Sequence, residues 1–306
     1  MTDNKDPAIG FIGLGLMGAA IAERLLARGR RLTVWNLEPG RIPPIVARGA
    51  VAAASPRAVA EASDIVLVCV LDTAAVESVV FGKDGVAEAA GPDKILVDHS
   101  TANPEPTAAM AARLKAATGM TWVDAPISGG PGFAREGRLT VMAGGEPSAF
   151  EAVLPVVRDY AANVTLMGPP GAGQMAKVIN QGICGVTYVL MAEVLRLAEE
   201  SGIDAALIPD CLRGGHADST LLHFAYPKMQ KRDFEPPASL TRAMLKDLHN
   251  VAAEAGRLGL VLPLIRAAEE RFALHAERGG AMRETCSVYE LYRETPNVIP
   301  AKAGTQ

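Results

Sequence analysis

The sequence is poor in the residues that build disulfides, metal sites and aromatic surfaces. Its 306 residues include four cysteines, five histidines and two tryptophans, and aromatic residues make up only 5%. The cysteines Cys69, Cys184, Cys211 and Cys286 are scattered without a C-x-x-C pair, and the histidines lack zinc-ligand spacing. We therefore predict no disulfide and no metal site.

A strong net charge and long apolar runs are lacking as well. Lys and Arg total 30 against 34 Asp and Glu, a formal net charge of -4, which gives no reason to expect binding to nucleic acid or to an anionic membrane. No apolar stretch reaches the roughly 20 residues needed to span a membrane. The first seven residues also lack the apolar core of a signal peptide. We expect a cytoplasmic protein that contacts neither nucleic acid nor membrane.

What the sequence does contain is a glycine turn close to its start. The turn follows an apolar run at 8–12 and precedes apolar spacing typical of a helix that ends before Gly29. A G-x-G-x-x-G turn between strand and helix predicts dinucleotide binding, because its glycines permit a sharp turn, close approach of a pyrophosphate and close helix packing. An ordinary glycine-rich turn is the alternative. The predicted cofactor contacts are Gly13, Leu14, Gly15, Leu16, Met17 and Gly18.

The segment after the second predicted strand, 31–36, is where such folds contact the adenosine ribose. Here the sequence has Asn36, Leu37 and Glu38, followed by Arg41. A carboxylate at Glu38 would accept from ribose hydroxyls and repel a 2′-phosphate, whereas Arg41 would attract one. A solvated loop is the alternative for either charge. We predict NAD or NADP as the cofactor and favour NAD.

Strand and helix patterns alternate through the first half of the chain, which argues for a parallel sheet with helices on both faces. In such sheets ligands bind beyond the carboxyl ends of the strands. The remaining predicted strands are 50–54, 65–70, 95–98, 121–125, 139–143 and 163–167. The helical stretches are 56–62, 104–117 and 147–157, and 73–90 is helical or turn-rich.

Three of these strand ends carry small or polar groups that suit a ribose or a carboxylate. They are Leu71 and Asp72 after one strand, Thr101 after the next, and Ser128, Gly129 and Gly130 after the third. Taken singly, each segment is also typical of a turn or a helix cap. His99, at the second of these ends, is a candidate general base for which no orienting partner is identified.

The Pro- and Gly-rich run at 168–173 predicts a domain boundary. Beyond it the pattern is helical, at 174–201, 208–213, 240–258 and 262–278. We therefore predict an α/β protein with an N-terminal Rossmann-type doubly wound sheet and an all-α C-terminal domain. The expected ranges are 1–168, 169–292 and a disordered tail at 293–306.

Lys177 lies near the start of the long predicted helix, with Asn180 and Gln181 three and four residues further on the same face. Apolar neighbours indicate that this turn is enclosed, and a buried lysine amine can exchange a proton with a substrate hydroxyl. A solvated lysine is the alternative. Lys246, followed by Asp247, is expected at the surface.

Four segments together resemble the β-hydroxyacid dehydrogenase family, which includes 3-hydroxyisobutyrate dehydrogenase and tartronate semialdehyde reductase. The resemblance extends from about Ala8 to Tyr292. The matching segments are Gly10 to Gly18, Asp124 to Gly130, Gly171 to Gln181, and Lys246 to Leu248, in the order of the family.

The resemblance implies an active site between the two domains and homodimers or homotetramers formed through the helical parts. It implies that Lys177 is the catalytic acid/base, that Asn180 or Gln181 orients the reacting oxygen, and that the Ser128-Gly129-Gly130 segment anchors a substrate carboxylate. It also places Leu71, Thr101 and Lys246 against the nicotinamide cofactor.

The sequence departs from the family at three places. Gln181 stands where many members have Asn, and Asp72 where many have Pro. The Asn36-Leu37-Glu38 segment lacks the arginine that many members have at its centre, which puts a strong preference for NADP in doubt.

These features predict an NAD(P)-dependent dehydrogenase that acts on a small β-hydroxyacid such as 3-hydroxyisobutyrate. One alternative is reduction of a short aldehyde acid, such as tartronate, succinic or glyoxylic semialdehyde-type substrates, by the same residues. Another is a dinucleotide-binding sensor or scaffold without turnover. The side-chain pocket of the substrate is expected to include part of 215–226.

Overall fold

The computed structural model describes residues 6–293, which form two compact units divided in the chain between Lys177 and Val178. The boundary between the units falls inside the helix α8 (Ala172–Ser201), whereas the sequence placed a domain boundary after Gly168. Apart from Arg293, the predicted tail 293–306 lies outside the described residues.

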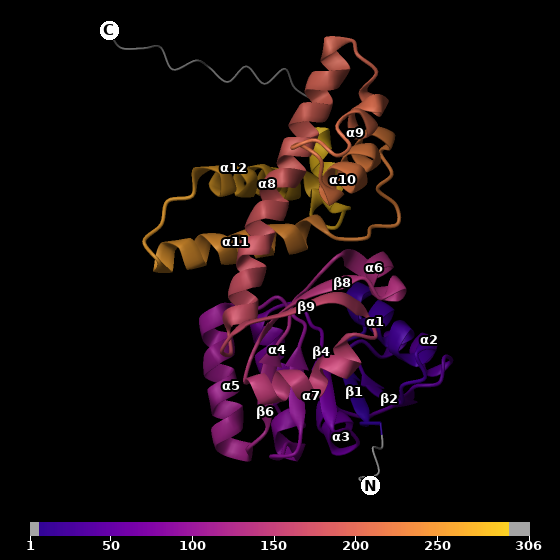
Figure 1. Cartoon of the computed structure of the whole chain (residues 1–306), viewed down its shortest axis with the longest axis vertical. Helices are drawn as coiled ribbons and strands as arrows, with labels where there is room; N and C mark the ends of the chain where they lie inside the picture. Colours follow the sequence, from indigo (N-terminus) through magenta and orange to yellow (C-terminus); the bar gives the residue numbers. More distant parts are fainter. Residues whose placement is uncertain (1–5, 294–306) are drawn as a thin grey trace. The chain divides into compact units, whose positions relative to one another are not determined.

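The N-terminal unit is built on one nine-stranded sheet (Figure 1). Its strand order is β3-β2-β1-β4-β5-β6-β8-β7, with β9 paired to β8, so the first six strands follow the order typical of dinucleotide-binding folds. This confirms the predicted Rossmann-type sheet. The strands are β1 (Ile9–Ile12), β2 (Leu32–Trp35), β3 (Val51–Ala52), β4 (Ile65–Val68), β5 (Ile95–Asp98), β6 (Thr121–Asp124), β7 (Ile127–Ser128), β8 (Leu139–Gly144) and β9 (Ala161–Gly168).

Strand β8 runs antiparallel to both β6 and β7, and β9 pairs in parallel with β8, while all other strand pairs of the sheet are parallel. The helices of this unit are α1 (Leu16–Ala27), α2 (Pro43–Val46), α3 (Pro56–Glu61), α4 (Thr73–Phe81), α5 (Pro104–Thr118), α6 (Gly130–Glu136) and α7 (Pro147–Val157), with 3-10 turns at η1 (Pro39–Arg41) and η2 (Val86–Ala89).

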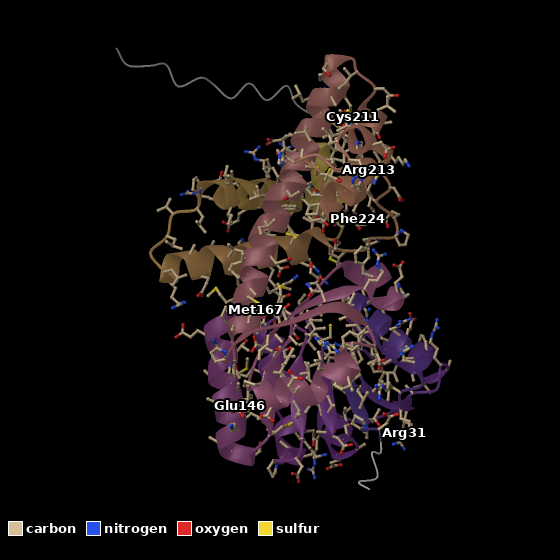
Figure 2. The ribbon with its side chains drawn as sticks, viewed as in Figure 1. Arg31, Glu146, Met167, Cys211, Arg213 and Phe224 are labelled. Atoms are coloured by element: carbon tan, nitrogen blue, oxygen red, sulfur yellow. The ribbon has the colours of Figure 1, made fainter. Side chains whose placement is uncertain are left out.

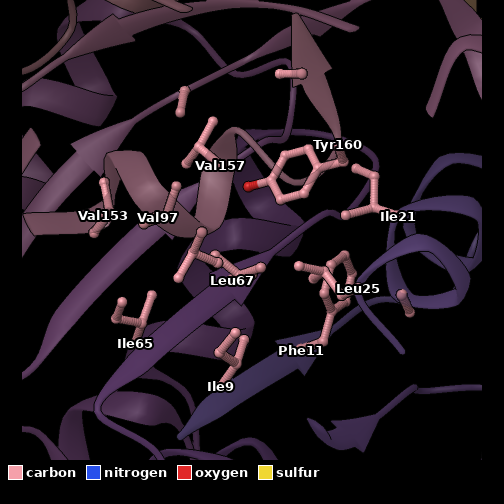
Figure 3. Close-up of a cluster of buried hydrophobic side chains, with 14 of the residues drawn as sticks. Ile9, Phe11, Ile21, Leu25, Ile65, Leu67, Val97, Val153, Val157 and Tyr160 are labelled. Atoms are coloured by element: carbon pink, nitrogen blue, oxygen red, sulfur yellow. The ribbon is translucent and has the colours of Figure 1, made fainter. Parts of the chain in front are cut away.

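Both faces of the sheet are buried, and alternate residues of each strand serve opposite faces. On β4, Ile65 and Leu67 pack in the cluster that contains the apolar faces of α1 and α7. Figure 3 shows Leu67 in this cluster together with Tyr160. The intervening Val66 and Val68 pack in the other cluster, with side chains of α3, α4 and α5. Helices therefore cover both faces, as the alternating pattern predicted.

The C-terminal unit is helical. Its core surrounds the middle of α8 and includes Tyr226, Phe272 and Tyr289. Helices α11 and α12 lie side by side (Figure 1). The remaining elements are η3 (Ala205–Leu207), α9 (Ile208–Cys211), α10 (Thr220–Lys231), α11 (Thr241–Arg257), α12 (Pro263–His275), the π segment η4 (Ala276–Gly280) and η5 (Thr285–Tyr292).

The stretch 73–90, predicted as helical or turn-rich, contains both kinds of structure, because backbone turns at Gly82 and Gly85 separate α4 from η2. Three other elements were missed. Neither β7 nor α6 was predicted, since β7 has two residues and α6 starts in a Gly-Gly-Pro segment. Helix α10 was missed as well, and it contains Pro227 in its interior.

Helix α8 also corrects the expectation about membrane spans. Among the described helices it alone is long and apolar enough, by length and composition, to cross a membrane. Half of its most apolar window is buried within the protein, which is the behaviour of a core helix.

Candidate active site

The three glycines of the predicted cofactor turn meet different surroundings. A Cβ atom on Gly13, whose φ is 98°, would lie 2.3 Å from the carbonyl oxygen of Cys69. A Cβ on Gly18 would lie 1.9 Å from the carbonyl oxygen of Gly13. A Cβ on Gly15, in contrast, would meet nothing within 4 Å. The fold itself therefore requires Gly13 and Gly18, whereas the space beside Gly15 remains open for a ligand.

The start of α1 has no side-chain cap. Gly15 is the N-cap residue, and no side chain accepts a hydrogen bond from the first turn of this helix. The first amides of a helix lack partners within it and, with the helix dipole, attract phosphate. The start of α1 is thus arranged to bind an anion.

Asn36 holds the end of β2 against the glycine turn. Its Oδ1 accepts from the amide of Leu14 at 2.7 Å, and its Nδ2 donates to the carbonyl of Glu38 at 3.0 Å. Leu37 is exposed, and the Glu38 carboxylate pairs with the guanidinium of Arg41 in an exposed loop. The predicted ribose segment therefore lies beside the turn, with its acidic and basic side chains partly neutralising each other.

The segment that follows β4 contains one exposed apolar residue, Leu71, and one helix-capping residue, Asp72. Leu71 is about half exposed. Asp72 caps α4, since its Oδ1 accepts from the amide of Ala75 at 2.9 Å. The Thr73 hydroxyl accepts from the amide of Asn103 at 2.9 Å, which ties this end to the segment that follows Thr101.

The Ser128-Gly129-Gly130 segment joins β7 to α6. Both glycines have left-handed φ values, 131° at Gly129 and 83° at Gly130, which side chains rarely adopt. A Cβ on Gly129 would also come within 2.9 Å of the Phe133 ring, whereas the space beside Gly130 is open. The backbone of Gly130 can therefore be approached closely.

Lys177 is buried, as its apolar neighbours predicted, with 7% of its surface exposed. Its Nζ donates a hydrogen bond of 2.8 Å to the carbonyl oxygen of Ile127. Ile127 immediately precedes Ser128, so the structure brings the predicted acid/base to the predicted carboxylate anchor.

The turn that carries Lys177 is fixed by Asp124 at the end of β6. The Asp124 carboxylate accepts from the amide of Gly171 at 2.7 Å and from the amide of Gln174 at 2.9 Å. Burial raises the pKa of Asp124 to about 6, against the lowering effect of these amides. A Cβ on Gly173 would lie 2.4 Å from the carbonyl oxygen of Met142, so this turn packs directly on the sheet.

Gln174 is completely buried and bridges α8 to the end of β5. Its Oε1 accepts from the amide of Ala102 at 3.0 Å, and its Nε2 donates to the carbonyl of Ser100 at 2.8 Å. These two hydrogen bonds are made by the residues immediately before and after Thr101. Sequence reasoning missed both Asp124 and Gln174, although both lie inside the segments that carried the family resemblance.

The charged groups at the end of β5 are core residues. Burial raises the pKa of Asp98 to about 7, and its Oδ2 has no hydrogen-bond partner. Burial lowers the pKa of His99 to about 4, and its ring nitrogens contact the carbonyl of Ala125 at 2.6 Å and the hydroxyl of Tyr160 at 2.8 Å. Because both ring nitrogens are occupied, His99 is a structural residue rather than a general base.

Asn180, Gln181 and Lys246 belong to a polar cluster in the C-terminal unit. The Gln181 Nε2 donates to Asp247 Oδ2 at 2.5 Å, and the Asn180 Nδ2 donates to Gln181 Oε1 at 2.7 Å. Lys246 Nζ lies 3.0 Å from Asp247 Oδ1. Asp247 is only 7% exposed, so the expectation of a surface Lys-Asp pair was wrong for the aspartate.

The region expected to line the substrate pocket is a loop followed by α10. His223 on α10 lies 2.5 Å from Asp218. Phe224, labelled in Figure 2, has 44% of its surface exposed. Within residues 6–293, no three His, Cys, Asp or Glu side chains gather as a metal site requires.

Two family models match the chain. The NAD binding domain of 6-phosphogluconate dehydrogenase matches residues 8–168, and the NAD-binding domain of NADP-dependent 3-hydroxyisobutyrate dehydrogenase matches 171–292. Among curated proteins, the chain is 37% identical over 273 residues to 2-hydroxy-3-oxopropionate reductase of Escherichia coli K12, covering 89% of this chain and 92% of the relative.

Solved structures are also similar to this chain along most of its length. The structure of 3-hydroxyisobutyrate dehydrogenase from Salmonella typhimurium is 32% identical, with a TM-score of 0.84 over 94% of this chain and 100% of that chain. A structure described as Psf3 in complex with NADP+ and 2-OPP is 26% identical, with a TM-score of 0.85 over 92% of this chain and 99% of that chain. With both halves matched and a relative above 30% identity along most of its length, the chain belongs to the β-hydroxyacid dehydrogenase family of NAD(P)-dependent oxidoreductases.

Proposed function

We propose that the protein reversibly transfers hydride between NAD(P) and the hydroxyl-bearing carbon of a small β-hydroxyacid, with Lys177 as the general acid/base. The observation that carries the proposal is the position of the Lys177 amine. It is buried, and it is held 2.8 Å from the carbonyl of Ile127, next to Ser128. An amine fixed in this way is within reach of the hydroxyl of an acid that is anchored at Ser128.

In the oxidative direction, the neutral amine of Lys177 takes the hydroxyl proton while the C–H bond of the same carbon breaks with its electron pair. A nicotinamide cofactor, held by the glycine turn, would supply the acceptor for this hydride. In reduction, the Lys177 ammonium returns the proton to the carbonyl oxygen. Protons and electrons balance in both directions.

The substrate carboxylate is assigned to Ser128, Gly129 and Gly130. The open space beside Gly130 and the left-handed backbone of this segment support close approach of a ligand to its amides. Asn180 and Gln181 are assigned to the reacting oxygen. In support, the Gln181 amide is oriented by a hydrogen bond to Asp247.

The cofactor is assigned to the glycine turn, with the pyrophosphate at the uncapped start of α1 and the open face of Gly15. Further assigned contacts, at the adenosine and nicotinamide ends, are Asn36, Leu37, Glu38, Leu71, Asp72, Thr101 and Lys246. NAD is favoured over NADP because the Glu38 carboxylate partly neutralises Arg41, the nearest cation after β2 that could hold a 2′-phosphate.

Two reactions can use the same catalytic and binding groups. The relatives include a 3-hydroxyisobutyrate dehydrogenase and a 2-hydroxy-3-oxopropionate reductase, so oxidation of the former acid and reduction of the latter aldehyde acid are both proposed. A sensor without turnover is the candidate of another class. A sensor would need no buried amine beside an anion site, and Lys177 therefore favours catalysis.

A homodimer or homotetramer is proposed for the assembly. Ile179, Ile183, Leu190 and Leu197 are exposed along α8. Their spacing of four and seven residues gives one apolar stripe, which is typical of a helix that packs against another helix. A second copy of the chain is the partner proposed for this stripe.

Lys177→Met tests the catalytic assignment. We expect kcat to fall by about 10³-fold, since a general acid/base contributes about 10²- to 10⁴-fold. Cofactor affinity, measured by calorimetry, should stay close to wild type. Lys115→Met, which removes a half-exposed lysine of the same unit, is the matched control and should keep full activity.

The assay follows nicotinamide absorbance with 3-hydroxyisobutyrate and 2-hydroxy-3-oxopropionate against both cofactors. Near-normal turnover by Lys177→Met would overturn the role of the lysine. Absence of turnover by the wild-type protein with hydroxy acids and aldehyde acids, together with cofactor binding, would favour the sensor.

A further inference from the structure

Two segments assigned to catalysis are joined by a side chain that has no assigned role. Thr101, at the end of β5, is assigned to the cofactor, and Lys177, on α8, is assigned to proton transfer. Gln174 lies on α8 one turn before Lys177, on the same helix face. Its carboxamide hydrogen-bonds the residues on either side of Thr101, at Ser100 and Ala102.

The two bonds of Gln174 are well formed for a positioning role. The carbonyl oxygen of the side chain accepts a backbone amide, the nitrogen donates to a backbone carbonyl, and both distances are 2.8 to 3.0 Å. Gln174 has no exposed surface, so water cannot replace these bonds without an opening of the unit. A buried amide or carbonyl that loses its partner is destabilising, because the loss of its contact with water is then uncompensated.

The backbone of Gln174 is fixed independently of its side chain. Its amide donates to Asp124 Oδ2, and the other carboxylate oxygen accepts from the amide of Gly171. The turn that bears Gln174 therefore cannot slide along the sheet without breaking these bonds. As a result, a displacement of the segment at Thr101 would be transmitted through Gln174 to the helix that bears Lys177.

We propose that Gln174 is a positioning residue that fixes the cofactor segment at Thr101 and the proton-transferring Lys177 relative to each other. The inference rests on the proposed function, because it assigns Gln174 a part in the same reaction. It predicts that one side chain, which touches neither substrate nor cofactor, controls both cofactor affinity and turnover.

The matched control is Lys94, which makes the same kind of clamp elsewhere in the unit. Its Nζ donates to the backbone carbonyls of Ala60 at 2.7 Å and Ser63 at 2.6 Å. Lys94 directly precedes β5, at the opposite end of the strand from Thr101. Gln174→Met and Lys94→Met thus each replace a two-bond clamp on the backbone by the same unbranched apolar side chain.

For Gln174→Met we expect kcat to fall by about 10- to 100-fold, as displacement of a reacting group by about 1 Å does, with weaker cofactor binding by calorimetry. For Lys94→Met we expect a lower Tm with kcat and cofactor affinity near wild type. Equal kcat in the two variants, or unchanged cofactor affinity in Gln174→Met, would overturn the proposal.

Gln174→Glu is a second variant that tests the same proposal if Gln174→Met does not fold. The ionised carboxylate can still accept from the amide of Ala102 but cannot donate to the carbonyl of Ser100, whereas the protonated form can do both. We expect kcat relative to wild type to rise as the pH falls from about 8 to about 5, because burial near Asp124 favours the protonated form. A ratio that does not change with pH would contradict the positioning role.

Activity of Lys177→Met distinguishes failure of the proposed function from failure of the positioning role of Gln174. If Lys177→Met is active, the proposed function fails, and the inference fails with it. If Lys177→Met is inactive while Gln174→Met matches Lys94→Met in kcat and cofactor affinity, only the positioning role of Gln174 is wrong.

Discussion

Helices α1 and α8 both begin within the N-terminal unit, each in a glycine-rich turn, but their first residues have opposite surroundings. At α1, no side chain caps the helix, and the space beside Gly15 is empty of protein atoms. At α8, the Asp124 carboxylate binds the amides of Gly171 and Gln174, and Gly173 packs against the sheet without room for a Cβ. The start of α1 therefore has space for an anionic ligand, whereas the start of α8 binds the Asp124 carboxylate of the protein itself.

The difference shows that the N-terminus of a helix can either bind a ligand or fix the helix on a sheet. Both helix starts concentrate amide donors and positive dipole. An open start binds a ligand, as assigned to α1. A start closed by Asp124 cannot do so, but it holds the helix rigidly on the sheet, and this is what a turn that presents Lys177 requires.

The comparison predicts its largest effects at the glycines of the first turn. Gly13→Ala should cost about 3 kcal/mol of unfolding free energy or more, because it combines a left-handed φ with a clash against the Cys69 carbonyl. Gly15→Ala should leave the unfolding free energy nearly unchanged, since its backbone is in an ordinary region and its Cβ meets no protein atom. Urea unfolding measures both.

Cofactor affinity then completes this test. Gly15→Ala should weaken cofactor binding at least about tenfold, or about 1.4 kcal/mol, because the added methyl group occupies the face assigned to the pyrophosphate. Unchanged affinity in Gly15→Ala would show that the open side of α1 does not receive the cofactor.

Beside the closed start of α8, Asp98 predicts a pH effect of moderate size, because burial and, to a smaller extent, the nearby Asp124 charge raise the pKa of its carboxyl. The pKa of Asp98 is raised from 3.8 to about 7 in the folded protein, so the folded state binds more protons than the unfolded state between these values. Stability contributed by the protonated carboxyl is therefore lost as the pH rises toward 7, by roughly 2 kcal/mol from pH 5 upward.

Asp98→Asn should remove this loss. The asparagine keeps an oxygen for the amide of Ser100 and carries no charge at Oδ2, which has no partner in the wild type. The measurement is urea unfolding of both proteins at about pH 5 and pH 8. Parallel pH dependence in the two proteins would exclude a raised pKa at Asp98. The contribution of His99, which acts in the opposite direction, cancels in the difference.

The smallest expected effect concerns cofactor choice beside α1. Glu38→Gln leaves Arg41 without its carboxylate partner and should raise kcat/KM for NADP relative to NAD by about threefold. The change is small because both side chains are largely exposed, and exposed ion pairs contribute about 1 kcal/mol or less. A ratio that moves toward NAD would contradict the assignment of Glu38 to the ribose.

Sequence predicted the open helix start better than the closed one, for a physical reason. The glycines of the first turn are close in the chain, and their spacing between strand and helix reports the local backbone directly. Asp124 and Gln174 act on partners 50 and 72 residues away, so neither residue has a local signature of its role. The same holds for Asp247, whose burial depends on the packing of α11 in the C-terminal unit.

The order of strands and helices was predictable because alternating burial on a two-sided sheet leaves a regular apolar pattern. Lys177 was identified by its apolar neighbours, and its enclosure is observed. Its contact with the carbonyl of Ile127 was not predictable, because it depends on β7, a two-residue strand. Sequence therefore proposed the residues of the candidate site, whereas the hydrogen bonds that hold them together became visible only in the fold.

The bond between Lys177 and residue 127 has a consequence for how such enzymes diversify. The acceptor is a main-chain oxygen, which every amino acid possesses. Substitution of the Ile127 side chain can therefore change the shape of the protein next to Lys177, while the lysine keeps its hydrogen bond to the carbonyl of residue 127. The group assigned to proton transfer can therefore keep its main-chain hydrogen bond while the side chains around it vary, so substitutions near Ile127 can alter the fit of a substrate without moving the amine.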